Sequence, residues 1–129
     1  MSATAVFGAV IFAKDPLRLA AFYQGLLGLE TAHSEPGLLV LDGQGVQLVV
    51  HGLPPAIAAE IEIGTPPQRR EDSALKLFFQ VPSLDLARAR AASLGGALNP
   101  PEQVWSARDF RACDGHDPEG NVIQLREPA

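Results

Sequence analysis

The chain has 129 residues, 47% of them hydrophobic and 19% charged, which suits one domain or two small fused units with a packed core and argues against wholesale disorder. Its net charge of −5 argues against nucleic acid as a partner, because a phosphate-binding surface needs clustered Lys and Arg side chains. Cys113 is the single cysteine, which excludes an intramolecular disulfide and a thiolate metal cluster within one chain. With no apolar run of about 20 residues and no secretory start, the sequence predicts a cytoplasmic protein without a membrane partner.

The first part of the chain has the pattern of one strand, one helix and three further strands. Residues 6–13 are rich in β-branched and aromatic side chains, which predicts a strand. Asp15 and Pro16 then offer an N-cap and a first helical residue, and Gly28 is expected to end the helix. Short strands are predicted at residues 29–33, 38–41 and 45–51, so this part is a βαβββ unit.

Residues 52–73 read as a connector. Four prolines make this segment partly rigid, and residues 61–63 fit a short extra strand. No motif in it points to chemistry.

The same pattern returns after the connector. Residues 74–81 predict a strand, Ser83 an N-cap, and residues 84–94 an Ala-rich helix ended by Gly95 and Gly96. A weak strand at 97–98 and a segment with Trp105 and Phe110 follow. The chain then forms a final hairpin, with a short strand at residues 111–113 before the turn of Asp117, Pro118, Glu119 and Gly120. This second part is therefore also a βαβββ unit.

The spacing of these signals indicates an internal duplication. The two caps, Asp15 and Ser83, stand 68 positions apart, as do the helix stops Gly28 and Gly96. The final strands add a third match, between Val46-Gln47-Leu48 and Ile123-Gln124-Leu125.

Three stretches carry a family resemblance: KDPLRLAAFYQGLLGLE, VPSLDLARARAASLGGAL and DPEGNVIQL. Together they resemble the vicinal oxygen chelate superfamily, which contains glyoxalase I, bleomycin-resistance and fosfomycin-resistance proteins, and extradiol dioxygenases. The resemblance implies an α+β fold in which two βαβββ modules form a curved mixed sheet around a cleft, with the helices outside. It also implies one domain over residues 1–129, with modules at 5–51 and 74–127 and a connector at 52–73.

The resemblance further implies where a metal would bind. Enzymes of the superfamily hold a divalent metal with ligands from the first and last strand of each module. Here those four positions fall on Gly8, Gln47, Lys76 and Gln124. Gly has no ligand atom, a Lys ammonium repels a cation, and a Gln oxygen is a weak neutral ligand. We therefore expect no metal and no other cofactor.

Strand alternation predicts which side chains face the cleft. The opposite parity is almost wholly apolar, so it suits packing under the helices. Trp105 and Phe110 fit a stacking wall of the cleft, and they fit core or dimer packing equally well. The predicted pocket comprises Gly8, Phe12, Gln47, His51, Lys76, Phe78, Trp105, Gln124 and Arg126.

These residues favour binding of a small anionic or oxygen-rich molecule in a pocket that has apolar walls and Lys76 as its main cation. One alternative is a lyase, isomerase or dioxygenase-type enzyme that uses Lys76 as a base or nucleophile, or an atypical metal site. Another is that Lys76 bonds both glutamines and merely fills the pocket. The superfamily resemblance also implies a homodimer.

Overall fold

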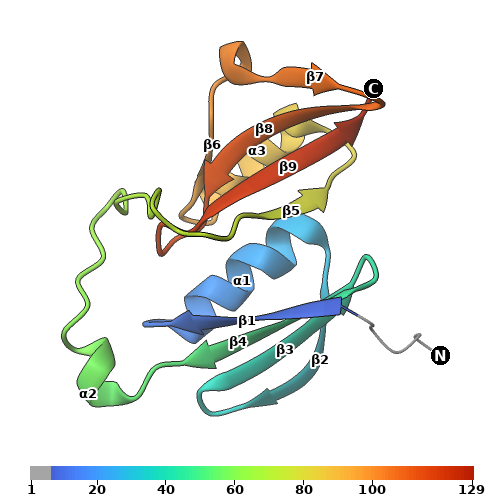
Figure 1. Cartoon of the computed structure of the whole chain (residues 1–129). Coiled ribbons are helices and arrows are strands. Elements are labelled where there is room, and N and C mark those ends of the chain that lie inside the picture. Colours follow the sequence, from blue (N-terminus) through green and yellow to red (C-terminus); the bar gives the residue numbers. More distant parts are fainter. Residues whose placement is uncertain (1–6) are drawn as a thin grey trace. The chain divides into compact units, whose positions relative to one another are not determined.

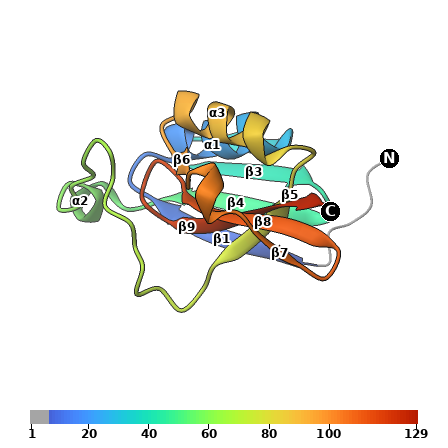
Figure 2. The same ribbon diagram turned by 90° about the horizontal axis from the view of Figure 1, so that it is seen from above.

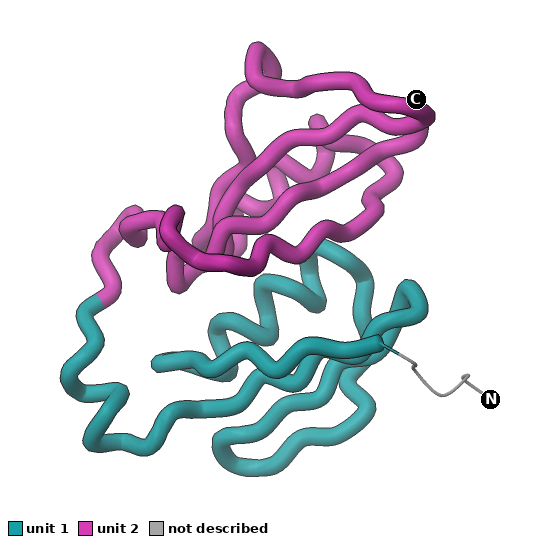
Figure 3. Tube along the Cα trace, viewed as in Figure 1, with its two compact units in different colours: residues 1–62 teal, residues 63–129 magenta. Residues whose placement is uncertain are grey.

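The computed structural model describes residues 7–129. The chain forms two compact units, residues 1–62 and 63–129 (Figure 3). Each unit carries its own mixed sheet and its own long helix (Figure 1). The α+β class and the repeated βαβββ order are therefore confirmed, and the proposed domain and module boundaries stay predictions.

The first unit is built around a four-stranded sheet with the order β1-β4-β3-β2. Strand β1 runs parallel to β4, and the other neighbours are antiparallel. The elements are β1 (Phe7–Ala13), α1 (Pro16–Leu27), β2 (Glu30–Glu35), β3 (Leu38–Gly43), β4 (Val46–Gly52) and the short α2 (Pro55–Ala58).

Local capping fixes the limits of α1 as the sequence predicts. The Asp15 carboxylate accepts a hydrogen bond from the Arg18 backbone N–H at 3.2 Å, and Pro16 opens the helix. Gly28 closes it in the left-handed conformation with φ of 69°. One face of α1 is buried on the sheet through Leu19, Ala20, Phe22, Tyr23 and Leu26.

The expected extra strand at residues 61–63 is wrong. The connector instead forms α2, which starts at Pro55 because proline suits the first helical position. The Ile61 N–H bonds the Ala58 carbonyl at 3.1 Å, so this backbone continues a turn and pairs with no strand in the described chain.

The second unit repeats the plan with one added strand. Its sheet has the order β5-β9-β8-β6, and β5 runs parallel to β9. The added strand β7 pairs with β8 on the side away from β9, as β6 also does. The elements are β5 (Leu77–Gln80), α3 (Leu84–Ser93), β6 (Ala97–Leu98), a 3-10 turn (Pro101–Gln103), β7 (Trp105–Ala107), β8 (Phe110–His116) and β9 (Val122–Pro128).

Both helices lie on one side of their own sheet, as the view from above shows (Figure 2). The N-terminus of α3 has two side-chain acceptors. Ser83 Oγ accepts from the Leu86 N–H at 3.2 Å, and Glu127 Oε2 on β9 accepts from the Leu84 N–H at 2.7 Å. A side chain of β9 therefore caps the start of α3, which packs on the same sheet.

The predicted alternation of the strands is confirmed in both units. Leu48 and Val50 of β4, and Ile123 and Leu125 of β9, are buried on the helix-covered faces. The opposite faces carry exposed side chains, among them Val10, Phe12 and Phe78. In contrast to these neighbours, Gln124 is only 7% exposed although it lies on the open face.

The proposed match of Gln47 with Gln124 is out of register. In the first unit Gly8 pairs with Gln47, whereas in the second Phe78 pairs with Gln124. Phe78 stands 68 positions after Val10, and Val10 pairs with Val49, so the ladder equivalent of Gln124 is Val49. A shift of two residues keeps every side chain on the same face, so the alternation could not reveal it.

The predicted turn before β9 is confirmed, and side-chain hydrogen bonds of Asp117 stabilise it further. The Gly120 N–H bonds the Asp117 carbonyl at 3.0 Å, and Asp117 Oδ1 accepts from the Glu119 and Asn121 backbone N–H groups. The connector docks on this turn, since the Arg70 N–H donates to the Gly120 carbonyl at 2.9 Å. A Cβ at Gly120, where φ is +86°, would collide with the Gln68 carbonyl oxygen.

No helix in residues 7–129 is long and apolar enough to cross a membrane.

Candidate functional site

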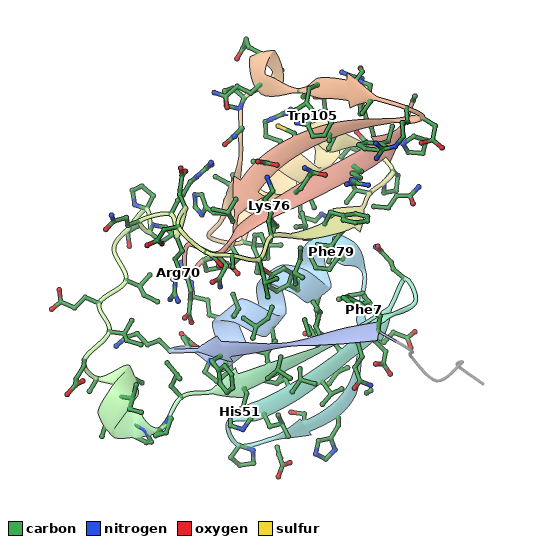
Figure 4. All side chains as sticks on the ribbon, in the orientation of Figure 1. Phe7, His51, Arg70, Lys76, Phe79 and Trp105 are labelled. Carbon is green, nitrogen blue, oxygen red and sulfur yellow. The ribbon has the colours of Figure 1, made fainter. Side chains whose placement is uncertain are left out.

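Charged and aromatic side chains gather on the open face of the second unit's sheet. Figure 4 labels two of them, Lys76 just before β5 and Trp105 on β7. Register places the others on the same face, because Phe78 pairs with Gln124, Asp114 with Gln124, and Ala112 with both Arg126 and Trp105. We call this set the β9 cluster: Lys76, Phe78, Trp105, Phe110, Asp114, Gln124 and Arg126.

A chain of hydrogen bonds runs through the polar members of the β9 cluster. Lys76 Nζ donates to Asp114 Oδ2 at 2.8 Å, which forms an ion pair with both side chains partly exposed. Gln124 Nε2 donates to Asp114 Oδ1 at 3.3 Å. Arg126 Nε then donates to Gln124 Oε1 at 2.7 Å. Asp114 thus receives two donors, and Gln124 links it to Arg126.

These contacts fix the orientation of the Gln124 amide. A carboxylate can only accept, so the amide nitrogen must face Asp114, and a guanidinium can only donate, so the amide oxygen must face Arg126. Both ends of the amide therefore have a partner. This explains how a polar side chain is tolerated with 7% exposure on an otherwise open face.

Aromatic rings surround the guanidinium of Arg126. Its Cζ lies 3.6 Å from the centroid of the Phe78 ring and 4.1 Å from that of Phe110, both within cation–π range. The Trp105 and Phe110 rings meet edge to face with centroids 5.9 Å apart. Arg108, in the β7–β8 turn, places its Cζ 5.0 Å from the Phe110 centroid. Trp105 therefore packs against the Phe110 ring, and the residue stays 43% exposed.

The open face of the first unit holds the remaining predicted residues. Gln47 Nε2 donates to Asp42 Oδ1 at 3.0 Å, and the Phe12 and His51 rings lie 5.6 Å apart. His51 Nδ1 is 2.8 Å from the Gly52 carbonyl oxygen. Gly8 lies against β4, where an added Cβ would stand 2.8 Å from the Gln47 carbonyl oxygen. The centre of this face is apolar and aromatic, and Asp42 shares the face with exposed Glu30 and Glu35 of β2.

The predicted pocket residues thus fall into two groups. Gly8, Phe12, Gln47 and His51 lie in the first unit, whereas Lys76, Phe78, Trp105, Gln124 and Arg126 lie in the second. Within the second group, hydrogen bonds and ring contacts join Lys76 to Gln124 through Asp114 and join Gln124 to Phe78 through Arg126. That both groups share one cleft stays a prediction.

Sequence reasoning missed Asp114 and Asp42, the two carboxylates that hold the glutamines. The short strand expected at residues 111–113 stopped before Asp114, while β8 in fact runs to His116. Extending its alternation from Phe110 would have placed Asp114 on the face of Gln124. Within the second unit Lys76 bonds Asp114 and does not bond Gln124, so the reading of Lys76 as a plug held by both glutamines is wrong for Gln124 and stays a prediction for Gln47.

The side chains at the implied metal positions do not fit a divalent cation. Gly8 has no ligand atom, and Lys76 brings a positive charge. Gln124 already gives its only acceptor oxygen to Arg126, and Gln47 offers no more than a neutral amide oxygen. In residues 7–129, no three His, Cys, Asp or Glu side chains are grouped so that they could hold a metal ion.

Comparison with known proteins places this geometry in a family. The model of the Glyoxalase-like domain matches residues 8–126. No curated protein sequence matches the chain.

Solved structures share the fold at low sequence identity. A glyoxalase/bleomycin resistance protein/dioxygenase family enzyme from Burkholderia phytofirmans PsJN is 19% identical, with a TM-score of 0.69 over 98% of this chain and 100% of that one. A glyoxalase-related enzyme from Fulvimarina pelagi is 15% identical, with a TM-score of 0.68 over 95% and 86%. The fosfomycin resistance protein FosX from Listeria monocytogenes is 15% identical, with a TM-score of 0.65 over 100% and 94%. At these identities the likeness concerns the fold alone.

Proposed function

We propose, from the premise that the chain belongs to the glyoxalase-like domain family, that it binds a small anionic or oxygen-rich molecule on the β9 cluster. The observation that carries the proposal is the charge of this face. The cluster has two cations, Lys76 and Arg126, with one carboxylate, Asp114, and a third cation, Arg108 of the β7–β8 turn, lies over the Phe110 ring in a chain whose net charge is −5. A local positive excess beside exposed aromatic rings suits an anion with an apolar body.

Binding on this face would be independent of a metal. In place of a metal ion, cationic side chains of the cluster would attract the anion. The Gln124 side-chain oxygen, which could otherwise face a metal, accepts a hydrogen bond from Arg126. Charge-assisted hydrogen bonds to an anion contribute roughly 1.5–3 kcal/mol each, so one or two such bonds plus ring burial support measurable affinity.

The similar structures support a small molecule as the class of ligand. Those from Burkholderia phytofirmans and Listeria monocytogenes carry names that refer to resistance against bleomycin and fosfomycin. We extend only the class of ligand to this chain and not those compounds.

An enzyme that uses Lys76 is the alternative, and the ion pair disfavours it. A base or nucleophile needs a lone pair on Nζ, whereas Lys76 Nζ donates to the Asp114 carboxylate at 2.8 Å. Chemical conversion of any bound compound, abolished by Lys76→Met, would favour the enzyme over the binding protein.

Isothermal titration calorimetry with a small panel tests the proposal. The panel comprises acetate, benzoate, inorganic phosphate, phenylphosphonate and the neutral benzamide. We expect at least one anion to bind, and the double variant Lys76→Met/Arg126→Met to weaken it about tenfold or more, equivalent to about 1.4 kcal/mol. The matched control is Lys14→Met/Arg18→Met, which removes two exposed cations from the first unit and should leave affinity unchanged.

Two results would contradict the proposal. The first is no binding of any anion at millimolar concentration, or equal affinity in both double variants. The second concerns metal independence: one tightly held Zn²⁺ or Mn²⁺ per chain by elemental analysis, lost in Gln124→Ala, would overturn that part.

The expected homodimer stays a prediction from the family resemblance. Sedimentation at micromolar protein concentration tests it, and a monomer alone would refute it.

A further inference from the structure

Arg126 has only one direction left in which it can bind a ligand. Its Nε donates to Gln124 Oε1 at 2.7 Å. The Phe78 and Phe110 rings come from β5 and β8, the strands on either side of β9, and both approach the guanidinium carbon within 4.1 Å. A ring from each flanking strand therefore lies against the guanidinium, Nε is used, and the outer edge with the two terminal nitrogens remains.

That outer edge is without a hydrogen-bond partner within the second unit. Among residues 63–129, nothing bonds the terminal nitrogens of Arg126 and no carboxylate forms an ion pair with it. Two parallel N–H groups at the edge of a guanidinium match the two oxygens of a carboxylate, which is why arginine forms bidentate pairs with planar anions.

Lys76 is in the opposite situation. Its ammonium already donates to Asp114 at 2.8 Å, and its side chain is 43% exposed. An incoming anion would compete with Asp114 for this ammonium and would meet the repulsion of that carboxylate. A water-exposed ammonium is also strongly hydrated and mobile, so it orients a ligand poorly.

From these contacts we infer that Arg126, rather than Lys76, receives the anionic group of the ligand, and that the group is a carboxylate carried by a flat apolar body. The inference rests on the proposed function and names its ligand class. The rings that lie against the guanidinium favour an anion that lies in its plane, whereas the tetrahedral oxygens of a phosphonate project out of that plane toward the rings. The exposed Trp105 and Phe78 then supply surface for the body of the ligand.

Gln124 is the positioning residue of this arrangement. It holds Nε of Arg126 while Asp114 holds its own amide nitrogen, so the two hydrogen bonds set the direction of the guanidinium edge. The hydrogen bonds that run from Lys76 to Arg126 therefore orient the arginine. The Asp114 carboxylate is used within this network, because it accepts from both Lys76 and Gln124.

Benzoate, benzamide and phenylphosphonate test the inference because they share one ring and differ in the polar group. Binding is followed by NMR on the Nε–H resonance of Arg126 and by calorimetry. We expect benzoate to shift this resonance in proportion to the bound fraction, benzamide to leave it unmoved, and phenylphosphonate to bind more weakly than benzoate. Tighter binding of phenylphosphonate would overturn the carboxylate assignment.

Two variants separate the arginine from the lysine. Arg126→Lys keeps the positive charge and removes the bidentate edge, so benzoate affinity should fall about tenfold or more. Lys76→Met removes a whole charge, yet it should cost less than about threefold. The reverse order would overturn the inference while leaving the proposed function intact, whereas the absence of anion binding to the unaltered protein would defeat the proposed function itself. The Arg126 resonance of the unaltered protein keeps the test decisive if Arg126→Lys fails to fold.

Discussion

The two modules place the same Asp–Gln pair on their open faces, yet only one of them surrounds it with cations. In the first unit Gln47 donates to Asp42 at 3.0 Å, and in the second Gln124 donates to Asp114 at 3.3 Å. In both cases the partners stand opposite each other on neighbouring antiparallel strands. The second unit adds Lys76 on the carboxylate and Arg126 on the amide oxygen. In residues 7–129, no ion pair reaches Asp42.

The difference shows that a repeated backbone does not repeat its electrostatics. The carboxylates of Asp42, Glu30 and Glu35 on the first face repel an anion, whereas the second face has more cations than carboxylates and attracts one. The neighbouring positions differ as well, since Gln47 lies opposite Gly8 and Gln124 opposite Phe78. Substitutions in the second unit should therefore have larger effects than their counterparts in the first.

The largest effect is expected at the turn on which the connector docks. Gly120 and Gly45 both have positive φ, +86° and +74°, but only an alanine at 120 would meet another segment, since nothing lies within 4 Å of a Cβ at 45. Gly45→Ala should lower the free energy of unfolding by about 1–2 kcal/mol through backbone strain alone. Gly120→Ala should cost about 4 kcal/mol or more, because the collision with Gln68 is added. Urea unfolding measures both, and equal losses would contradict the docking of the connector.

The start of α3 should be more sensitive than the start of α1. Glu127→Ala removes the acceptor of the Leu84 N–H and the partner of Arg111, whose Nη1 lies 2.9 Å from Glu127 Oε1. We expect a loss of about 2 kcal/mol, as for a hydrogen bond to a charged group. Asp15→Ala in the first unit should cost about 1 kcal/mol, the usual value of an N-cap.

Hydrogen exchange locates the effect of Glu127→Ala. Faster amide exchange confined to the first turn of α3 is the expected result. An unchanged exchange rate there would mean that the Glu127 carboxylate does not stabilise the helix start.

The smallest effect concerns ligand affinity. Asp114→Asn removes the one carboxylate of the β9 cluster, so benzoate should bind about threefold more tightly, while Asp42→Asn in the first unit should leave its affinity unchanged. Calorimetry measures both. A loss of affinity in Asp114→Asn would mean that Asp114 positions the ligand site more than it opposes an anion.

Local signals in the sequence were sufficient for the elements and their faces. Asp15, Pro16 and Gly28 each act within a few residues of themselves, so the limits of α1 followed from them, and the α+β order of both modules followed from the repeat. Alternation along β4 and β9 separated buried from open side chains, because a strand exposes every second residue whatever it pairs with.

Tertiary structure decided the register and the partners. A slip of two residues preserves alternation, so the sequence could not show that Gln124 faces Phe78 and corresponds to Val49. Lys76 and Asp114 are 38 residues apart and meet only because β5 and β8 flank β9 in one sheet. The sequence by itself determined which side chains are available on the open face of each module. Strand order decided which of these charges neutralise one another and which cation is left for a ligand. The reason is that charges pair by their distance in space and not by their distance along the chain.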